Sequence, residues 1–493
     1  MAAALRLAHA GARVTVLERF ATPGGKMRTV ASVAGPVDAG PTVLTMKPVF
    51  DQLFADVGTS LDQHVILEQE ALLARHFWPD GTSLDLMSDH AASVDRITAA
   101  FGAQAAAEFD RFCQRSARLF DAFEGPMMHA PAPTLAGMSS VVLRDPTLIP
   151  AMSPHKNMAQ MLRGQFTQPK LAQLFARYAT YVGGLPGQSP ALLSLIWEAE
   201  RRGVWHVKGG MHQLARAIAD LAAQRGAVFH YNTPVNRIEM QDGRVFAVET
   251  DAGRMPVDAV LFNGDPRALE TGLLGAAVQG AIPKTATQPR SLSANVYAFA
   301  ATPTGGFPLA AHNVFFANDP AREYLPLGKG QPQSDPTLYI CAQDRFAGAL
   351  PEGPERFEII LNAPPTDQTT QTPQETSLCQ TLIFNRLAQF GLRFSPAPDV
   401  TELTTPVQFN AMFPASMGSL YGRSPRGMMA AFQRPTARSK IKGLYLVGGG
   451  VHPGAGVPMA TLCAAHAAGA MIKDLCLTST SQPGDMPGGM STA

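Results

Sequence analysis

Apolar and polar positions along the chain follow two different periods, and together they predict a mixture of helices and strands. Residues 2–10 (AAALRLAHA) have the composition of a short helix. Residues 12–18 (ARVTVLE) form an apolar run that ends in an acid, which predicts a buried strand. Apolar residues recur at helical spacing in AEFDRFCQRSARLFDAF, so residues 105–180 are predicted to be mostly helical.

The second half of the chain alternates shorter elements. The helix MHQLARAIADLAAQRG is followed by the strands AVFHY, VNRIEM, RVFAVET and DAVLFNG, and QDGR between two of them predicts a hairpin turn. The runs SLSANVYAFAA, TLYICAQD and FEIILNA predict further strands, and ETSLCQTLIFNRLAQFG predicts a helix. Residues 444–472 are apolar enough to resemble a membrane span, but their glycines, prolines and histidines predict a strand, a loop and a helix.

Composition excludes several classes of function. The chain has 493 residues, which is more than one hydrophobic core usually accommodates, so two or three domains are expected. The net charge of +1 provides no electrostatic footprint for nucleic acid. The five cysteines contain no CxxC spacing, so neither a disulfide framework nor a metal site is expected. No signal-peptide pattern leads the chain, and a cytoplasmic location fits these features.

The opening segment carries the first candidate site. An acid at the end of such a strand, Glu18, can accept hydrogen bonds from the ribose of an adenosine, although an exposed acid at a strand end is the plain alternative. Paired glycines allow backbone N–H groups to approach a diphosphate, and a nearby cation offsets its charge. The loop that meets this description contains Gly24, Gly25 and Lys26, and a second tight turn contains Asp38, Gly40, Pro41 and Thr42. Surface turns are the alternative for both loops.

The closing segment carries the second candidate site. After the strand LYLV, three glycines (Gly448–Gly450) leave a bare backbone, and HPGAGVP leads into a helix that is expected to start near Met459. The N-terminus of a helix has unpaired N–H donors and partial positive charge, which can stabilise negative charge on a flavin. A loose loop between two core elements is the alternative, but two prolines make this loop rigid.

In these motifs the chain resembles the carotenoid (phytoene-type) desaturases among the FAD-dependent, amine-oxidase-like oxidoreductases. The matching segments are VTVLERFATPGGKMRT, VDAGPTVLT, GVWHVKGGMHQLARAIADL, FNGDP, GSLYGRSP and LYLVGGGVHPGAGVP, in that order. Within the family, TPGGKMRTV, GPVDAGPTVLT, RYATYVGG and GVWHVKGGMH look closest to the hydroxyneurosporene (methoxyneurosporene) desaturases of purple-bacterial spheroidene synthesis.

The resemblance implies an α/β fold with a Rossmann-like FAD-binding domain and an interleaved α+β substrate domain. The FAD-binding domain is expected from residues 1–70, 201–290 and 431–475. Residues 71–200 are expected to form a helical or mixed region for substrate and membrane contact, and residues 291–430 a substrate-domain sheet. Residues 476–493 are expected to be a flexible tail.

The resemblance also implies roles for particular residues around non-covalent FAD. Glu18 would bind the adenosine ribose, and the backbone of Val235 would contact the adenine. Asp265 lies where the chain of the family re-enters the FAD domain. The diphosphate, ribityl and flavin parts would contact Gly24, Gly25, Lys26, Gly40, Pro41, Thr42, Gly449, Gly450, Pro458 and Met459. Relatives commonly have arginine where this chain has Lys26, so the charge is kept and the planar fork is not.

The reaction implied is C-3,4 desaturation of 1-hydroxyneurosporene or a related acyclic 1-hydroxy carotenoid, with hydride transfer to flavin N5. The sequence identifies no catalytic acid or base, and it leaves oxygen and a quinone open as the electron acceptor. A phytoene desaturase or another FAD oxidase of this fold is an alternative. An amine oxidase with a covalent flavin is disfavoured, because Cys463 falls inside the helix that follows the flavin loop. A lipid-binding escort without FAD is a non-enzymatic alternative.

Two expectations concern the surface and the beginning of the chain. The methionine-rich stretch at 127–161 is a candidate for peripheral contact with the inner face of the cytoplasmic membrane, with ordinary core packing as the alternative. In a dinucleotide-binding unit, the helix at residues 2–10 would follow a strand and a GxGxxG turn, which are absent here. We therefore expect a chain that starts late and binds FAD more weakly than an extended one.

Overall fold

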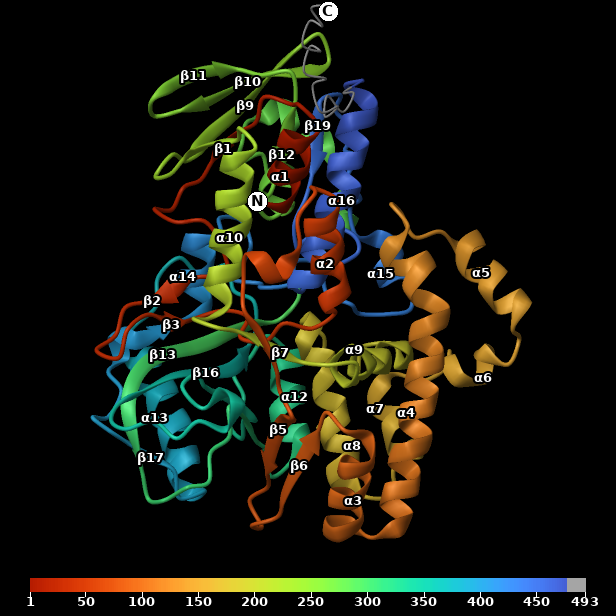
Figure 1. The fold of residues 1–493 in the computed structure, drawn as a ribbon, viewed down its shortest axis with the longest axis vertical. Helices are drawn as coiled ribbons and strands as arrows, with labels where there is room; N and C mark the ends of the chain where they lie inside the picture. Colours follow the sequence, from red (N-terminus) through yellow and green to blue (C-terminus); the bar gives the residue numbers. More distant parts are fainter. Residues whose placement is uncertain (477–493) are drawn as a thin grey trace, which may run out of the picture.

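The computed structural model describes residues 1–476, and the predicted flexible tail lies outside them except for Cys476. The upper part of Figure 1 gathers segments that are far apart in the sequence. Strand β1 pairs in parallel with β8, and β12 pairs in parallel with β19. Helix α1 packs between α10 and α16. These elements are α1 (Ala2–His9), β1 (Thr15–Leu17), α10 (Met211–Gln224), β8 (Val228–His230), β12 (Val260–Phe262), β19 (Leu444–Leu446) and α16 (Val457–Asp474).

The strand predicted at residues 12–18 is shorter and less buried than expected. Strand β1 has an exposed Thr15 and half-buried Val16 and Leu17. The reason is its position, because β1 is hydrogen-bonded along one edge only, to β8, within a two-stranded sheet. The prediction of a strand from the apolar run is therefore confirmed, but the strand is less buried than predicted.

A three-stranded antiparallel sheet confirms the predicted hairpin. It consists of β9 (Val235–Gln241), β10 (Arg244–Thr250) and β11 (Gly253–Pro256). The two turn residues between β9 and β10, Asp242 and Gly243, have φ angles of 51° and 74°. Positive φ at both central positions is the geometry that favours Asp-Gly in a two-residue hairpin turn.

The large sheet in the lower part of Figure 1 has the order β17-β13-β16-β15-β14-β5-β6, with β18 also paired to β13. Its apolar face packs against α13, where Ile383 and Leu387 meet Tyr297, Phe299 and Phe357. Two of its strands come from the segment expected to be helical or mixed. The elements are β5 (Leu72–Phe77), β6 (Ser83–Met87), β13 (Ser293–Thr304), β14 (His312–Phe315), β15 (Leu338–Ala342), β16 (Glu355–Ala363), α13 (Pro373–Gln389), β17 (Arg393–Ser395) and β18 (Leu403–Thr404).

A helical region on the right of Figure 1 has its own aromatic core. Phe109 and Phe112 of α4 pack against Phe175 of α8 and Trp197 of α9, and all four side chains are buried. This packing explains the helical periodicity of the sequence. The helices are α3 (His90–Phe101), α4 (Ala103–Glu124), α5 (Leu135–Arg144), α6 (Leu148–Met152), α7 (Met158–Gln165), α8 (Pro169–Ala176) and α9 (Ile196–Arg201).

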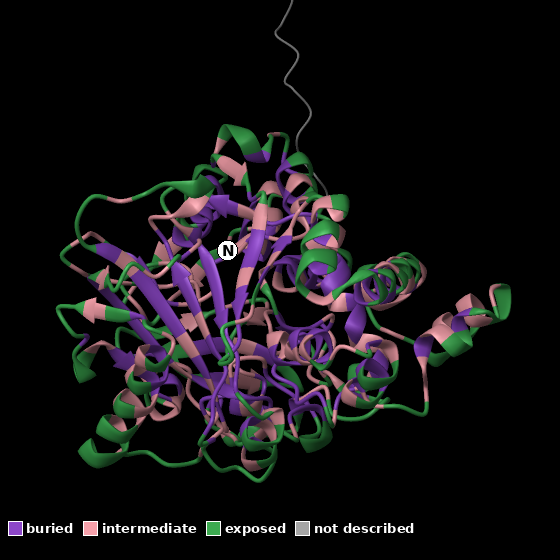
Figure 2. Ribbon diagram, turned by 90° about the horizontal axis from the view of Figure 1, so that it is seen from below, coloured by how far each residue is buried: buried purple, intermediate pink, exposed green. Residues whose placement is uncertain are grey.

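Helices α5 and α6 project from the body of the molecule in both views (Figures 1 and 2). No residue of α5 is buried. Of the methionines proposed for membrane contact, Met152, Met158 and Met161 are buried in hydrophobic clusters, whereas Met127, Met128 and Met138 are half-buried. Among the described residues, no helix combines the length and hydropathy needed to cross a bilayer.

Short elements connect these parts. They are β2 (Thr29–Val30), β3 (Val37–Asp38), α2 (Lys47–Ala55), β4 (Leu67–Gln69), β7 (Trp205–Val207), α11 (Arg267–Glu270), α12 (Pro320–Gly328), α14 (Pro406–Met412) and α15 (Ala430–Gln433).

Candidate cofactor and substrate site

The two glycine turns of the opening segment lie against each other. A Cβ atom at Gly40 would collide with the backbone carbonyl oxygen of Lys26, and one at Gly24 would collide with that of Met27. Gly24 and Gly25 both have positive φ angles, of 122° and 58°. Glycine is therefore required at Gly24 and Gly40 by the close approach of two backbone segments, which is the geometry expected of a loop that surrounds a ligand.

Lys26 reaches from this loop to a distant one. Its Nζ atom donates a hydrogen bond to the carbonyl oxygen of Leu420, at 2.6 Å, and lies 5.4 Å from the centre of the Phe413 ring. The pKa of Lys26 is lowered to about 8, mainly by burial and also by the nearby positive charges of Arg290 and Arg434, whereas Asp265 opposes the shift. A buried ammonium group without a carboxylate in contact is prepared for an anion.

Arg434 joins the closing glycine loop to the segment around residue 420. It donates hydrogen bonds to the carbonyl oxygens of Gly449 (3.1 Å), Tyr421 (2.9 Å) and Arg423 (2.8 Å). A Cβ atom at Gly450 would lie only 2.6 Å from Cδ of Pro266, so this position has no room for a side chain. The closing loop is thus held tightly beside the segments that carry Lys26 and Asp265.

Within residues 1–476, Asp265 is the carboxylate that lies among these cations. It forms a buried ion pair with Arg290 and also accepts the backbone N–H of Arg267, at 2.9 Å. Arg290 donates further hydrogen bonds to the carbonyl oxygens of Ser416 and Thr287. Lys26, Arg290 and Arg434 therefore outnumber Asp265, and this part of the site is positively charged. That charge fits an anionic cofactor such as FAD.

The second turn is held by polar contacts. The buried carboxylate of Asp38 accepts the backbone N–H groups of Met211 (2.6 Å) and His212 (3.4 Å), so it caps the start of α10. The hydroxyl of Thr42 is 2.8 Å from the hydroxyl of Tyr339, which in turn is 2.8 Å from Nδ1 of His312. The turn is therefore anchored to the large sheet through β14 and β15.

The remaining predicted residues lie in two further places. Glu18, at the end of β1, accepts the N–H of Phe20 at 2.9 Å, and its carbonyl accepts the N–H of Thr233, which brings it close to Val235 at the start of β9. Pro458 and Met459 lie in the first turn of α16, which begins at Val457. The structure thus joins the loops of Lys26 and Gly40 to the closing glycine loop through the segment at residues 420–423, and it places Glu18 close to Val235.

Arg290 and Arg434 have no signal in the sequence that predicts a place in the site. The motif GSLYGRSP contains Leu420 and Tyr421, but its pattern predicts no role for either residue. A lone arginine carries no spacing signal, so only the fold shows that these side chains enter the site.

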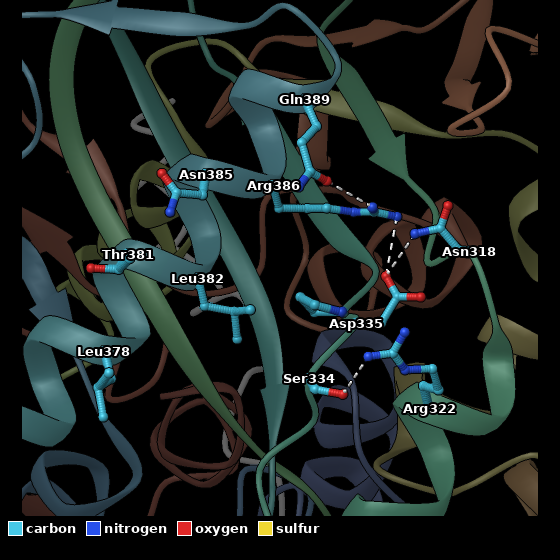
Figure 3. A pocket seen from close by; sticks show the side chains of 11 residues that line it. Asn318, Arg322, Ser334, Asp335, Leu378, Thr381, Leu382, Asn385, Arg386 and Gln389 are labelled. Atoms are coloured by element: carbon cyan, nitrogen blue, oxygen red, sulfur yellow. Dashed lines mark hydrogen bonds and ion pairs between the residues drawn. The ribbon is translucent and has the colours of Figure 1, made fainter.

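A separate surface pocket has no part in this arrangement (Figure 3). Its polar side chains satisfy one another, since Asp335 pairs with Arg386 and accepts from Asn318, and Arg322 donates to Ser334. None of the predicted site residues lines it. The lining residues are Asn318, Arg322, Ser334, Asp335, Pro336, Leu378, Thr381, Leu382, Asn385, Arg386 and Gln389.

Comparison with known proteins extends over nearly the whole chain. The family described as flavin containing amine oxidoreductase matches residues 1–472. Hydroxyneurosporene desaturase of Cereibacter sphaeroides is 52% identical over 476 residues, covering 96% of each chain. The protein of the same name from Rhodobacter capsulatus is 50% identical over 475 residues, again covering 96% of each chain. These matches confirm the resemblance seen in the motifs.

The fold is shared with solved structures at low sequence identity. A putrescine oxidase structure aligns with a TM-score of 0.55 and 12% identity, covering 96% of each chain. The predicted fold class is therefore confirmed.

Proposed function

Because the chain belongs to the family of flavin-containing amine oxidoreductases, we propose that it is an FAD-dependent carotenoid desaturase that oxidises a CH–CH bond of an acyclic 1-hydroxy carotenoid. We further propose that the substrate is 1-hydroxyneurosporene or a close relative, and that the bond is the 3,4 bond. The observation that carries this proposal is the 52% identity to a hydroxyneurosporene desaturase over 96% of both chains.

The arrangement of loops supports the predicted contacts with FAD. We propose that Glu18 binds the adenosine ribose and that the backbone of Val235 contacts the adenine. Gly24, Gly25 and Lys26 would lie along the diphosphate and ribityl parts, and Asp265 would lie where the chain re-enters the FAD domain. Gly40, Pro41 and Thr42 would lie near the flavin. The diphosphate and the flavin edge would be lined by Gly449, Gly450, Pro458 and Met459. The diphosphate of FAD is anionic, so the excess of buried positive charge around Asp265 supports a position for the diphosphate beside Lys26.

Bound FAD supplies the hydride-accepting chemistry, at its N5 position. The reaction would take a hydride from one carbon of a carbon–carbon single bond to FAD and release a proton from the neighbouring carbon to solvent, which leaves a double bond. The residues of the chain contribute position and electrostatics. The positive charges of Lys26, Arg290 and Arg434 would stabilise negative charge on the part of FAD that binds beside them. The polyene delocalises positive charge on its own carbon atoms, so a strong base is not required.

The projecting arm formed by α5 and α6 supports peripheral membrane contact. Leu135, Leu143 and Ile149 on this arm expose 57%, 79% and 48% of their surfaces. Exposed apolar side chains on a short surface helix can enter the headgroup region without spanning a bilayer. A carotenoid is dissolved in lipid, so we propose that this arm rests on the inner face of the cytoplasmic membrane. Free thiols at all five cysteines agree with a cytoplasmic location.

The experiment that tests the function supplies purified protein with FAD, lipid, an electron acceptor and a single carotenoid. We expect 1-hydroxyneurosporene to lose two hydrogen atoms and its absorption spectrum to shift to the red. Oxygen and a quinone are supplied in separate reactions to identify the acceptor. Conversion of phytoene alone would contradict the proposed substrate and favour a phytoene desaturase.

The same preparation tests the escort alternative. Purified protein with the visible absorbance of bound flavin would contradict an escort that lacks FAD. Cys463 is buried and burial raises its pKa to about 12, so this thiol is unsuited to a covalent flavin link. We therefore expect denaturation to release the flavin completely.

A further inference from the structure

A cluster of polar side chains around Arg177 lies beside the predicted flavin loops. Arg177 begins the short helical turn η3 (Arg177–Val182), and its Nη1 atom donates a hydrogen bond to the hydroxyl of Tyr181, at 2.9 Å. The guanidinium lies over two rings, 5.1 Å from the centre of Tyr181 and 5.3 Å from that of Tyr339. Within the described residues, no carboxylate lies within 4.0 Å of this guanidinium. Arg177 therefore has no carboxylate in direct contact in this part of the chain, although its charge acts from a greater distance on Glu200 and Glu323, where it opposes the rise that burial causes in the pKa of each.

The cluster retains unused hydrogen-bond donors. Within residues 1–476, Nε and Nη2 of Arg177 donate no hydrogen bond to a protein atom. Both nitrogens also keep some accessible surface. The hydroxyl of Tyr181 accepts a hydrogen bond from Arg177, and its own proton has no acceptor. The hydroxyl of Tyr339, in contrast, is already occupied by Thr42 and His312. Arg177 and Tyr181 thus present donors to accessible space.

The space that these donors face is enclosed. Arg177, Tyr181 and Tyr421 lie deep in the protein, yet each keeps part of its side-chain surface accessible. Accessible surface on groups that are surrounded by protein to this extent faces an internal recess. The raised pKa values of the two tyrosines, about 12, agree with this placement. The accessible surface of the cluster therefore faces a poorly hydrated recess, in which an unpaired donor is costly.

The cluster is connected to two predicted flavin loops, directly through Tyr339 to one and through Tyr421 and Arg434 to the other. Tyr339, on which Arg177 stacks, contacts Thr42 of the second turn. Gly183, which follows η3, lies against Tyr421, because an added Cβ atom would be 2.5 Å from Cδ2 of that ring. The carbonyl of Tyr421 is held by Arg434, which also binds Gly449. A ligand atom at Arg177 would thus be close to the reacting end of the site.

We propose that Arg177 and Tyr181 bind the terminal oxygen of an oxygenated polyene and thereby select it over a hydrocarbon carotenoid. This inference rests on the proposed function and names the polar recognition within it. An alcohol oxygen accepts from both the guanidinium and the phenol. A hydrocarbon leaves those donors unpaired in the recess, which is a strong basis for discrimination.

The same contact would position the bond that reacts. In a 1-hydroxy carotenoid, three bonds separate the oxygen from carbon 3, so holding the oxygen fixes the 3,4 bond within a small volume. Such positioning reduces the entropy lost on reaching the reactive geometry. Arg177 and Tyr181 are therefore specificity-determining residues, and proton transfer is not assigned to them.

The test measures binding by the FAD-loaded protein. Quenching of its intrinsic fluorescence is titrated with 1-hydroxyneurosporene and, separately, with neurosporene in the same detergent micelles. We expect wild-type protein to bind the hydroxylated carotenoid at least about tenfold more tightly, as one charge-assisted hydrogen bond provides. In Arg177→Met and Tyr181→Phe the ratio should fall towards one, and the dissociation constant for neurosporene should change less than about twofold.

Arg96→Met, on the exposed face of α3, is the matched control and should keep the wild-type ratio. A ratio that persists in both cluster variants would overturn the inference, and so would an equal weakening of both carotenoids, which would indicate a packing role. Tyr181→Phe removes only one oxygen atom, so it decides the matter if Arg177→Met does not fold. Failure of the proposed function is distinguishable, because it would leave 1-hydroxyneurosporene unoxidised by wild-type protein whatever the binding ratio.

Discussion

The ammonium group of Lys26 donates a 2.6 Å hydrogen bond to the backbone carbonyl oxygen of Leu420, a residue 394 positions away in the sequence. This contact joins the first glycine loop to the segment held by Arg434. It also places a buried cation where the diphosphate of FAD is proposed to bind. The two loops are therefore expected to respond together to the cofactor.

The first prediction concerns Lys26 and pH. Because burial lowers the pKa of Lys26 to about 8, the ammonium loses its proton above about pH 8, and FAD must then restore it on binding. FAD affinity should therefore fall as pH rises above about 8. Lys26→Arg should remove this dependence, because arginine keeps its charge, and Lys26→Met should weaken FAD binding about tenfold below that pH.

Fluorescence titrations with FAD across this pH range provide the measurement. Lys208→Met, at an exposed position, is the control and should behave as wild type. An unchanged pH dependence in Lys26→Arg would show that another group is responsible.

The second prediction concerns the packing of the closing loop. Gly450→Ala places a methyl group 2.6 Å from Cδ of Pro266, so the loop must shift away from Asp265. We expect about a tenfold loss of FAD affinity, since a shifted loop loses its backbone contacts with the cofactor. Gly469→Ala is the matched control in α16, where nothing lies within 4 Å of an added Cβ, and it should stabilise the protein by up to about 1 kcal/mol. Equal FAD affinity in Gly450→Ala and wild type would contradict the proposed contact.

The third prediction concerns Glu358, whose two carboxylate oxygens are buried without a hydrogen-bond partner among the described residues. Burial raises the pKa of Glu358 well above its ordinary value, and Asp38 adds to the rise, whereas Arg28 opposes it. The folded protein therefore keeps a proton that the unfolded chain releases above about pH 4.5. Stability should decrease as pH rises through this range.

Glu358→Gln should remove that loss and raise the free energy of unfolding at pH 8 by about 1 to 2 kcal/mol. Urea denaturation at pH 8 and near pH 4.5 measures the effect, and the gain should disappear at the lower pH. Glu352→Gln, at an exposed position, should change neither value. Destabilisation by Glu358→Gln at pH 8 would mean that the carboxylate is ionised and paired in the folded protein.

The fourth prediction concerns the arm formed by α5 and α6. The double variant Leu143→Ser, Ile149→Ser should float with acidic lipid vesicles severalfold less than wild type, because two exposed apolar anchors are lost. Leu378→Ser, at an equally exposed position on α13, should float as wild type does. If the wild-type holoprotein does not float with the vesicles, the proposal that this arm contacts a membrane is wrong.

Local patterns predicted much of the fold. The Asp-Gly turn between β9 and β10, the helices α4, α10 and α16, and the strand, loop and helix of the closing segment were all expected from neighbouring residues. These features depend on periodicity and backbone preference, which act over a few positions. The burial of β1 was overestimated and the pairing of β5 with β14 was not predicted, because both depend on which distant strand lies alongside.

The sequence by itself determined the glycine loops, because glycine, proline and acid positions at fixed spacing specify backbone conformations that a cofactor needs. The resemblance of its motifs to the carotenoid desaturases implied the family and the flavin chemistry. Only the tertiary structure decided that Arg290, Arg434 and Arg177 enter the site and that the methionines at 158 and 161 lie in the core. The physical reason is distance along the chain. The charge and hydration at a buried site are sums over residues from many segments, and no local pattern contains such a sum.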